Sequence, residues 1–269
     1  MVAFASNSIL CRLALRQTTI DPASFTFIRI LSGAIALWLI MQIRRATLHK
    51  AGSWLSAFAL FVYAAAFSFA YLSLPAGTGA LLLFGAVQAT MILWGLIKGE
   101  RLRASQLVGL LIAMIGLIIL VFPGLSAPSL SGSILMLAAG VAWGSYSLRG
   151  RRENSPAIAT TGNFLRAIPF VALLSLCLFR WIRLDGLGIL YAILSGALTS
   201  GLGYVIWYSA LTSLPAAIAA TVQLSVPVLA AAGGILLLGE PLNLRFLLAS
   251  ITVLGGIALV VLYRKPMRR

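Results

Sequence analysis

The sequence predicts an all-α integral membrane protein in which ten transmembrane helices form two inverted five-helix repeats around a central cavity. Three observations support this prediction: the apolar composition, a series of long apolar runs, and an internal repeat. Of the 269 residues, 61% are hydrophobic and only 9% are charged, and the mean hydropathy is +1.05. A soluble domain carries about 25% charged residues, so lipid must surround most of this chain.

The apolar runs are long enough to cross a bilayer, because its hydrocarbon core of about 30 Å needs about 20 helical residues. In chain order, the predicted spans are Val2–Leu15, Phe25–Ile43, Trp54–Leu74, Ala76–Ile97, Ser105–Phe122, Ser131–Leu148, Ala157–Phe179, Gly186–Leu211, Ala216–Leu238 and Asn243–Tyr263. Their all-round apolar character excludes surface helices, and their length excludes barrel strands of about 10 residues. The first run is short, so we expect an abbreviated or partly embedded first helix.

The distribution of basic residues predicts the orientation of the spans. The net charge of +15 would suggest nucleic acid in a soluble protein, but here the basic residues lie almost entirely between apolar runs. With ten spans and a cytoplasmic N-terminus, 13 of the 20 basic residues fall in inner loops and the tail. The five outer ones are Arg12, Arg16, Arg180, Arg183 and Arg245. This asymmetry predicts that both termini are cytoplasmic.

An internal repeat relates the two halves of the chain. Residues 73–76 (Ser-Leu-Pro-Ala) recur as residues 213–216, and Gly99-Glu100 recurs at the same offset as Gly239-Glu240. The predicted repeats are residues 1–129 and 130–269, which together form one membrane domain. Because each repeat has five helices, the second must enter the membrane from the opposite side. Such inverted repeats are common in secondary transporters, which bind their substrate near the midplane between the repeats.

Other classes of protein fit these features less well. An intramembrane enzyme would need a nucleophile with a base, a metal cluster or paired carboxylates in a pocket, and the predicted spans contain no Asp, Glu or His. We therefore predict that the chain is not an enzyme. Cys11 and Cys177 lie in or beside apolar runs, and the only histidine, His49, lies in a basic loop, so neither a metal nor a cofactor is expected. A channel, or a duplicated scaffold without a transport role, remains an alternative.

The order of several motifs resembles the drug/metabolite transporter superfamily, specifically its ten-helix EamA-type carriers. The resemblance rests on the starts of the first and sixth helices, on arginines near the starts of the second and seventh, and on Gly-Glu pairs closing the fourth and ninth. These motifs are Ser6-Asn7-Ser8, Trp143-Gly144-Ser145, Arg29, Arg166, Gly99-Glu100 and Gly239-Glu240. Within the family the chain looks most similar to the YddG-type exporters of aromatic amino acids.

The resemblance implies a multi-pass exporter of the bacterial inner membrane with a cavity lined by helices one, three, four, six, eight and nine. Its expected partners are a small-molecule substrate and the lipid bilayer rather than nucleic acid, and a monomer is compatible with this fold. The alternative within the superfamily is an exporter of drugs or quaternary ammonium compounds. Such cations usually require a carboxylate within the membrane.

Polar and aromatic residues inside the spans are the candidates for the substrate cavity. Interfacial belts and helix–helix hydrogen bonds account for many such residues, so the helix on which each lies decides the choice. The predicted cavity residues are Asn7, Tyr71, Phe84, Gln88, Trp143, Tyr146, Tyr204 and Gln223. Aromatic walls with few charges suit a partly apolar substrate, such as an aromatic or another large neutral amino acid.

A second group of residues is predicted to have structural or gating roles: Arg29, Arg166, Glu100, Glu240 and Pro227. Inverted topology would place Arg29 near Glu240 and Arg166 near Glu100, so each arginine could bind the glutamate or the helix-end carbonyls of the other repeat. Contact with a substrate carboxylate is the alternative. Pro227 removes a backbone donor and predicts a kink. Because all five acidic residues lie in loops or at helix ends, we expect facilitated diffusion or exchange rather than proton coupling.

Overall fold

The computed structural model describes residues 1–46, 51–99, 104–122, 127–151, 153, 155–211 and 222–262, and these residues form helices without any strand. The first half contains α1 (Val2–Gln17), α2 (Pro22–Ile43), α3 (Trp54–Ala70), α4 (Ala76–Ile97) and α5 (Ala104–Val121). The second contains α6 (Leu130–Gly150), α7 (Pro156–Cys177), the short 3₁₀ helix η1 (Phe179–Trp181), α8 (Gly186–Ile193), η2 (Leu194–Leu202), α9 (Gly203–Leu211), α11 (Ser225–Leu238) and α12 (Leu244–Leu262).

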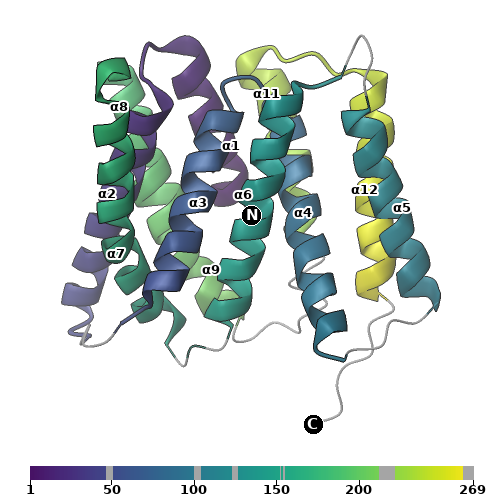
Figure 1. The fold of residues 1–269 in the computed structure, drawn as a ribbon, viewed down its shortest axis with the longest axis horizontal. Helices are drawn as coiled ribbons and strands as arrows, with labels where there is room; N and C mark the ends of the chain where they lie inside the picture. Colours follow the sequence, from purple (N-terminus) through teal and green to yellow (C-terminus); the bar gives the residue numbers. More distant parts are fainter. Residues whose placement is uncertain are drawn as a thin grey trace.

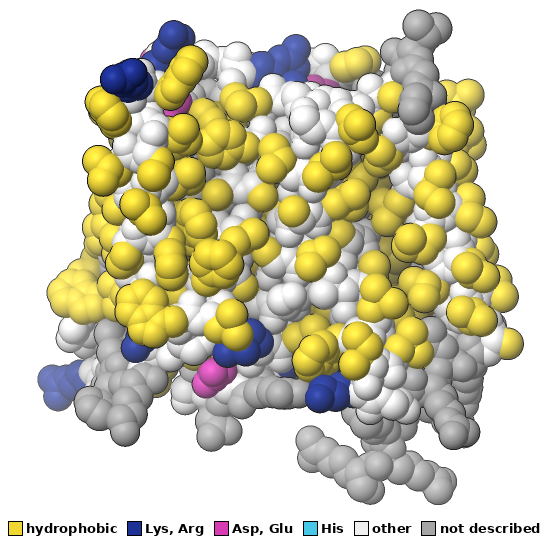
Figure 2. Space-filling model, in the orientation of Figure 1, with side chains coloured by type: hydrophobic (Ala, Val, Ile, Leu, Met, Phe, Trp, Pro, Cys, Tyr) yellow, Lys and Arg dark blue, Asp and Glu magenta, His cyan; other side chains and the backbone are white. Residues whose placement is uncertain are grey.

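The helices are arranged as a membrane protein requires. Among the described residues, six helices are long and apolar enough to cross a bilayer: α2, α4, α5, α7, the continuous Gly186–Trp207 and α12. The helices α3 and α11 are shorter apolar helices. All run roughly along one direction between two ends where the connections lie (Figure 1). Hydrophobic side chains cover the surface between these ends, and the charged side chains gather at the two ends (Figure 2).

Local sequence explains where α2 begins. Asp21 lies directly before the helix, and its Oδ1 accepts hydrogen bonds from Ala23 N and Ser24 N, each at 2.9 Å. An aspartate at this position satisfies backbone donors that have no partner inside the helix, and Pro22 fits the first turn because it lacks a backbone N–H. Asp21 Oδ2 also accepts from Arg183 N at 2.9 Å. The turn between α1 and α2 is therefore joined to the connection between α7 and α8.

Helices of the two halves pack against one another throughout the bundle. The pairs formed between halves include α5 with α12, α2 with α7, α4 with α11, α3 with α6 and α1 with η2. The α5–α12 pair illustrates how close these contacts are, because a Cβ added at Gly256 would lie 2.5 Å from the Gly109 carbonyl oxygen. Small residues permit such close backbone approach in membrane helices. The halves thus form one packed unit.

The eighth predicted run, Gly186–Leu211, contains a feature that the sequence analysis did not predict. Its middle segment, η2, is a π-helix of nine residues, in which hydrogen bonds join residues five apart instead of four. η2 packs against α2 so closely that a Cβ on Gly196 would come within 2.1 Å of both Arg29 O and Ser32 Oγ. Its buried residues are Ser195, Gly196, Thr199, Ser200 and Gly201. Polar groups are therefore held between helices at this point.

The ninth predicted run is described only from residue 222 onward. Residues 222 and 223 are helical, Leu224 lies in a turn, and α11 begins at Ser225. Pro227 is buried in the first turn of α11. Because Pro227 has no N–H to offer the carbonyl four residues before it, the helix is interrupted close to the position where the sequence predicted a kink.

Candidate functional site

A small cavity lies inside the bundle, between helices of both halves. Its volume is about 20 Å³, which is room for about one water molecule. It is lined by residues of α1, α3, α4, α6 and α9, namely Phe4, Asn7, Ser8, Tyr63, Phe67, Leu83, Phe84, Trp143 and Tyr204. Most of this lining is aromatic or aliphatic, and none of these side chains carries a formal charge at neutral pH.

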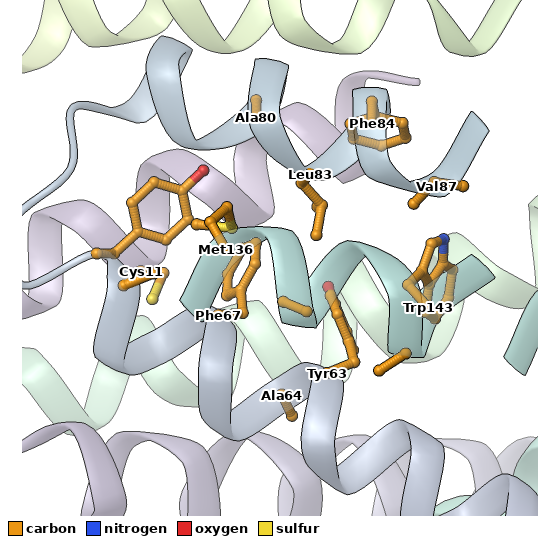
Figure 3. Close-up of a cluster of buried hydrophobic side chains, with 14 of the residues drawn as sticks. Cys11, Tyr63, Ala64, Phe67, Ala80, Leu83, Phe84, Val87, Met136 and Trp143 are labelled. Atoms are coloured by element: carbon orange, nitrogen blue, oxygen red, sulfur yellow. The ribbon is translucent and has the colours of Figure 1, made fainter. Parts of the chain in front are cut away.

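Aromatic rings form one continuous wall of the cavity. The ring of Trp143 lies 4.9 Å from that of Tyr63 and 5.0 Å from that of Tyr204, measured between centroids. Behind this lining, Trp143 also stacks with Tyr146, which is not part of the lining, at 5.3 Å and an interplanar angle of 24°. Figure 3 shows Tyr63, Phe67 and Trp143 on one side and Leu83 and Phe84 of α4 on the other. Edge and offset contacts of this kind favour a rigid apolar wall.

Asn7 is the centre of a polar network beside this wall. Its Nδ2 donates to Tyr63 Oη at 3.3 Å, and its Oδ1 accepts from Ser195 Oγ at 2.6 Å. Thr199 Oγ1 lies 3.3 Å from the same Oδ1 and also donates to Ser195 O at 2.7 Å. A buried amide must find partners for both its donor and its acceptor. The π-helix η2 supplies the acceptor's partners, so it fixes the orientation of Asn7.

Four of the eight predicted cavity residues line this cavity: Asn7, Phe84, Trp143 and Tyr204. The remaining four, Tyr71, Gln88, Tyr146 and Gln223, are not part of its lining. Tyr71 is buried beside Phe67 and its hydroxyl donates to Ala76 O at 3.2 Å. Tyr146 donates to Thr160 Oγ1 at 3.4 Å.

Gln88 and Gln223 occupy different surroundings. Gln88 lines a second space of about 10 Å³ between α4, α5 and α12, and its Nε2 has no hydrogen-bond partner among the described residues. Gln223 is half-buried, just before the turn at Leu224. The space beside Gln88 thus contacts α5 and α12 instead of α1 and α6, and it is separate from the cavity that contains Asn7.

Arg29 is buried in the centre of the network, with 1% of its surface exposed. Its Nη2 donates to Tyr63 Oη at 2.9 Å and lies 3.5 Å from Ser200 Oγ. Its guanidinium carbon lies 5.2 Å from the ring centroid of Tyr63 and 4.9 Å from that of Phe67. The predicted pairing of Arg29 with Glu240 is not present, because Glu240 binds a different arginine.

That arginine is Arg12, which the sequence analysis assigned to an outer loop and which the structure places inside α1, 9% exposed. Arg12 Nε and Glu240 Oε1 form an ion pair at 3.1 Å. Arg12 Nη1 donates to Tyr71 O at 2.7 Å, and Glu240 Oε2 accepts from Ala76 N at 2.8 Å. The pair therefore joins α1, the turn between α3 and α4, and the turn after α11.

At the opposite end of the bundle, arginines of the second half bind the first turn of α3 and the chain just before it. Arg166 donates to the carbonyl oxygens of Ala51 and Gly162, and Arg149 Nε donates to Ser56 Oγ at 2.9 Å. The acceptors at this end are carbonyl and hydroxyl oxygens. Glu100, the predicted partner of Arg166, lies outside the described residues.

The predicted cavity residues did not include Phe4, Ser8, Tyr63, Phe67 and Leu83 of the cavity lining, or Ser195 and Thr199 of the polar network. One signal could have indicated the last two. Ser195, Thr199 and Ser200 are polar residues clustered with glycines inside an otherwise apolar run, and polar groups inside a membrane span mark internal contacts or sites. The described residues contain no group of three His, Cys, Asp or Glu side chains that could hold a metal ion.

Comparison with known proteins agrees with this architecture. A family model described as the EamA-like transporter family matches residues 1–122 and 130–262. An uncharacterized protein of Pseudomonas aeruginosa is 58% identical over 262 residues, which cover 97% of this chain and 91% of that protein. The threonine/homoserine exporter RhtA of Escherichia coli K12 is 36% identical over 156 residues, 55% of this chain and 51% of the exporter.

Two further similarities extend over more of the chain than the similarity to RhtA does. A probable amino-acid metabolite efflux pump of Salmonella typhimurium is 28% identical over 201 residues, 68% of this chain and 67% of the pump. A solved crystal structure with 19% sequence identity superimposes with a TM-score of 0.69 over 97% of this chain and 96% of that one, which supports the fold. Because the family model covers nearly the whole chain, this protein is a multi-pass membrane protein that belongs to the EamA-like transporter family.

Proposed function

We propose that this protein exports amino acids and related small metabolites across the bacterial inner membrane by alternating access, with aromatic and other large neutral amino acids among its substrates. The aromatic cavity enclosed by helices of both halves is the observation that carries the proposal. Pockets of this kind hold partly apolar ligands and use a few polar groups to orient them. The exporter and efflux-pump names of the relatives agree with an amino-acid substrate.

The proposal includes an inverted relation between residues 1–129 and 130–269, which form ten spans. The family model matches each half separately. Helix packing agrees with a two-fold exchange of α1 with α6, α2 with α7, α3 with α8–α9, α4 with α11 and α5 with α12. Under this exchange, the contact of α3 with α6 becomes that of α1 with η2, and α4 with α6 becomes α1 with α11. The pairs α2–α7, α4–α11 and α5–α12 map onto themselves.

The size of the cavity is the reason for alternating access. A space of about 20 Å³ is far below the several hundred cubic ångströms that ligand pockets usually occupy. Substrate entry therefore requires helices around the cavity to separate on one side of the membrane. Inverted repeats provide two related arrangements, one open to each side.

We propose that flux occurs by facilitated diffusion or exchange. Asp21, Asp185 and Glu240 lie at helix ends or turns, and Glu153 lies in the connection between α6 and α7. Proton-coupled carriers usually place a carboxylate or histidine in the membrane interior. A pH gradient is therefore expected to leave exchange rates unchanged.

The decisive experiment is counterflow of radiolabelled phenylalanine, tryptophan, threonine and methionine in proteoliposomes, with and without a pH gradient. Saturable uptake driven by the same amino acid inside is the expected result, and Trp143→Ala should reduce it because it removes the centre of the aromatic wall. Trp181→Ala is the matched control, since Trp181 is 72% exposed on η1. Absence of uptake by folded protein would overturn the amino-acid assignment.

Quaternary ammonium compounds are the second candidate class, because the aromatic rings around Trp143 present faces that attract cations. Tetraethylammonium should therefore be included as a competitor. If it inhibits and is itself exchanged while amino acids are not, the protein is a drug exporter.

Orientation is tested with cysteines at opposite ends of the bundle. We propose that both termini are cytoplasmic, which places Glu153 inside and Arg183 outside. In a Cys177→Ser background, Arg183→Cys in intact cells should react with a membrane-impermeant maleimide and Glu153→Cys should not. Both positions are exposed, and the remaining Cys11 is fully buried. The reverse labelling pattern would invert the proposed topology.

A further inference from the structure

Arg29 is a buried cation that lacks a counter-charge. Its side chain makes hydrogen bonds through Nη2 alone, and both acceptors are hydroxyl oxygens. Its Nε and Nη1 have no partner among the described residues. A guanidinium has five N–H donors, and leaving a buried charged donor unpaired costs more free energy than leaving a neutral one. The site is therefore incomplete as it stands, and an anion is the chemical group that would complete it.

Arg29 also lies next to the cavity. Its guanidinium is within about 5 Å of the rings of Tyr63 and Phe67, as given above, and both rings line the cavity. Figure 3 shows how these two side chains project from α3 toward α4. One layer of side chains separates the charge from the space where a substrate would bind. At this depth, water screens a charge weakly, so an anion in the cavity would feel it strongly.

Tyr63 connects Arg29 to the cavity. Its hydroxyl oxygen accepts hydrogen bonds from Arg29 Nη2 and Asn7 Nδ2, so its own proton is free to point elsewhere. No acceptor for that proton is present among the described residues. Two donors directed at one phenol oxygen also favour its role as a donor to an anion, because hydrogen bonds in a chain strengthen one another.

We propose that Tyr63 and Arg29 form the carboxylate subsite of this transporter: the Tyr63 hydroxyl donates a hydrogen bond to the α-carboxylate of an amino acid, and that carboxylate supplies the negative charge that Arg29, directly behind Tyr63, lacks. The inference rests on the proposed amino-acid export and names the group by which the site recognises its substrate. Charge-assisted hydrogen bonds to a carboxylate are about twice as strong as neutral ones. The same charge repels quaternary ammonium compounds, so the subsite selects amino acids over the cations that the aromatic wall alone would accept.

The test compares each amino acid with its amide, which keeps the side chain and removes the carboxylate. In wild-type proteoliposomes, phenylalanine should compete for counterflow at least about tenfold better than phenylalaninamide, the ratio that one charge-assisted hydrogen bond supplies. Arg29→Gln should weaken the competition by phenylalanine and leave the competition by phenylalaninamide unchanged, so that the ratio of the two falls toward one. Arg149→Gln is the control for a lost arginine, because Arg149 binds Ser56 at the end of the bundle.

A second variant covers the case in which Arg29→Gln does not fold. Tyr63→Phe keeps the ring and its packing and removes only the hydroxyl, and it should reduce the acid-to-amide ratio in the same direction. Tyr191→Phe, on half-buried Tyr191 of α8, is the matched control and should keep the wild-type ratio. If wild-type protein exchanges phenylalanine but binds the amide equally well, the carboxylate subsite is wrong and the proposed export stands. If no amino acid is exchanged, the proposed function itself fails.

Discussion

Arg12 and Arg29 lie on consecutive helices and are both buried, yet their surroundings differ in kind. Arg12, near one end of the bundle, has the carboxylate of Glu240 at 3.1 Å and two backbone carbonyls as acceptors. Arg29, in the centre, has two hydroxyl oxygens and two unpaired nitrogens. A buried charge with all its partners holds structure together, whereas a buried charge without a counter-ion is available to a ligand. The comparison distinguishes an ion pair that joins three parts of the bundle from the proposed binding site.

The largest expected effect on the free energy of unfolding comes from removing the counter-charge of Arg12, which would then lack one as Arg29 does. Glu240→Gln removes the counter-charge while keeping the shape of the side chain, and it leaves Arg12 as an unpaired buried cation. Breaking one partner of a buried ion pair costs about 3–5 kcal/mol, so the free energy of unfolding in mixed micelles should fall by that amount. Glu153→Gln, at an exposed position, should change it little. A loss no larger than that of the control would show that Arg12 and Glu240 do not brace the bundle.

An intermediate effect on stability is expected from a substitution that forces η2 and α2 apart. Gly196→Ala places a methyl group within 2.1 Å of Arg29 O and Ser32 Oγ, so η2 or α2 must move. Overpacking of this kind costs about 1–3 kcal/mol, and it should also reduce phenylalanine affinity because Arg29 and Ser200 shift. Gly186→Ala, where a Cβ would meet nothing within 4 Å, is the control. Unchanged stability and affinity would mean that the close contact does not position Arg29.

The smallest effect is expected from an arginine that is neither buried nor charge-paired. Arg149 is exposed and donates to the hydroxyl oxygens of Ser56 and Ser53. Arg149→Gln should lower the free energy of unfolding by about 1 kcal/mol, the usual net value of a hydrogen bond. The same unfolding measurement checks it. A loss comparable to that of Glu240→Gln would remove the distinction between braced and exposed arginines.

The helical fold could be predicted from sequence because lipid permits few alternatives. A chain in hydrocarbon must satisfy its own backbone hydrogen bonds, so long apolar runs become helices, and the described bounds follow the predicted runs closely. Arg12 was counted with an outer loop although the predicted apolar run Val2–Leu15 contains it, and the structure places it inside α1. A charge inside a run can belong to the helix when another element supplies its partner.

The site was only partly predictable, because an apolar sequence does not determine which of its side chains point toward the interior of the bundle. Asn7, Phe84, Trp143 and Tyr204, which line the small cavity, were predicted from the helices on which they lie. Tyr63 and Phe67 lie on α3 among other aromatic residues, and hydropathy alone does not tell which of them faces inward. The partner of Glu240 depended on contacts across more than 200 residues of sequence, which no local pattern contains.

The π-helical segment η2 has a consequence for how this chain tolerates insertion and deletion. Each residue turns an α-helix by about 100° and advances it by about 1.5 Å. Removing one residue from an α-helix would therefore rotate everything after it by about a quarter of a turn. The segment Leu194–Leu202 differs, because a turn that joins residues five apart can close into an α-helical turn when one residue is lost. Tyr204 would then keep its place beside Trp143, while the contacts of Ser195 and Thr199 with Asn7 would be rearranged. The extra residue that η2 accommodates, and not only its composition, is thus part of the proposed binding site.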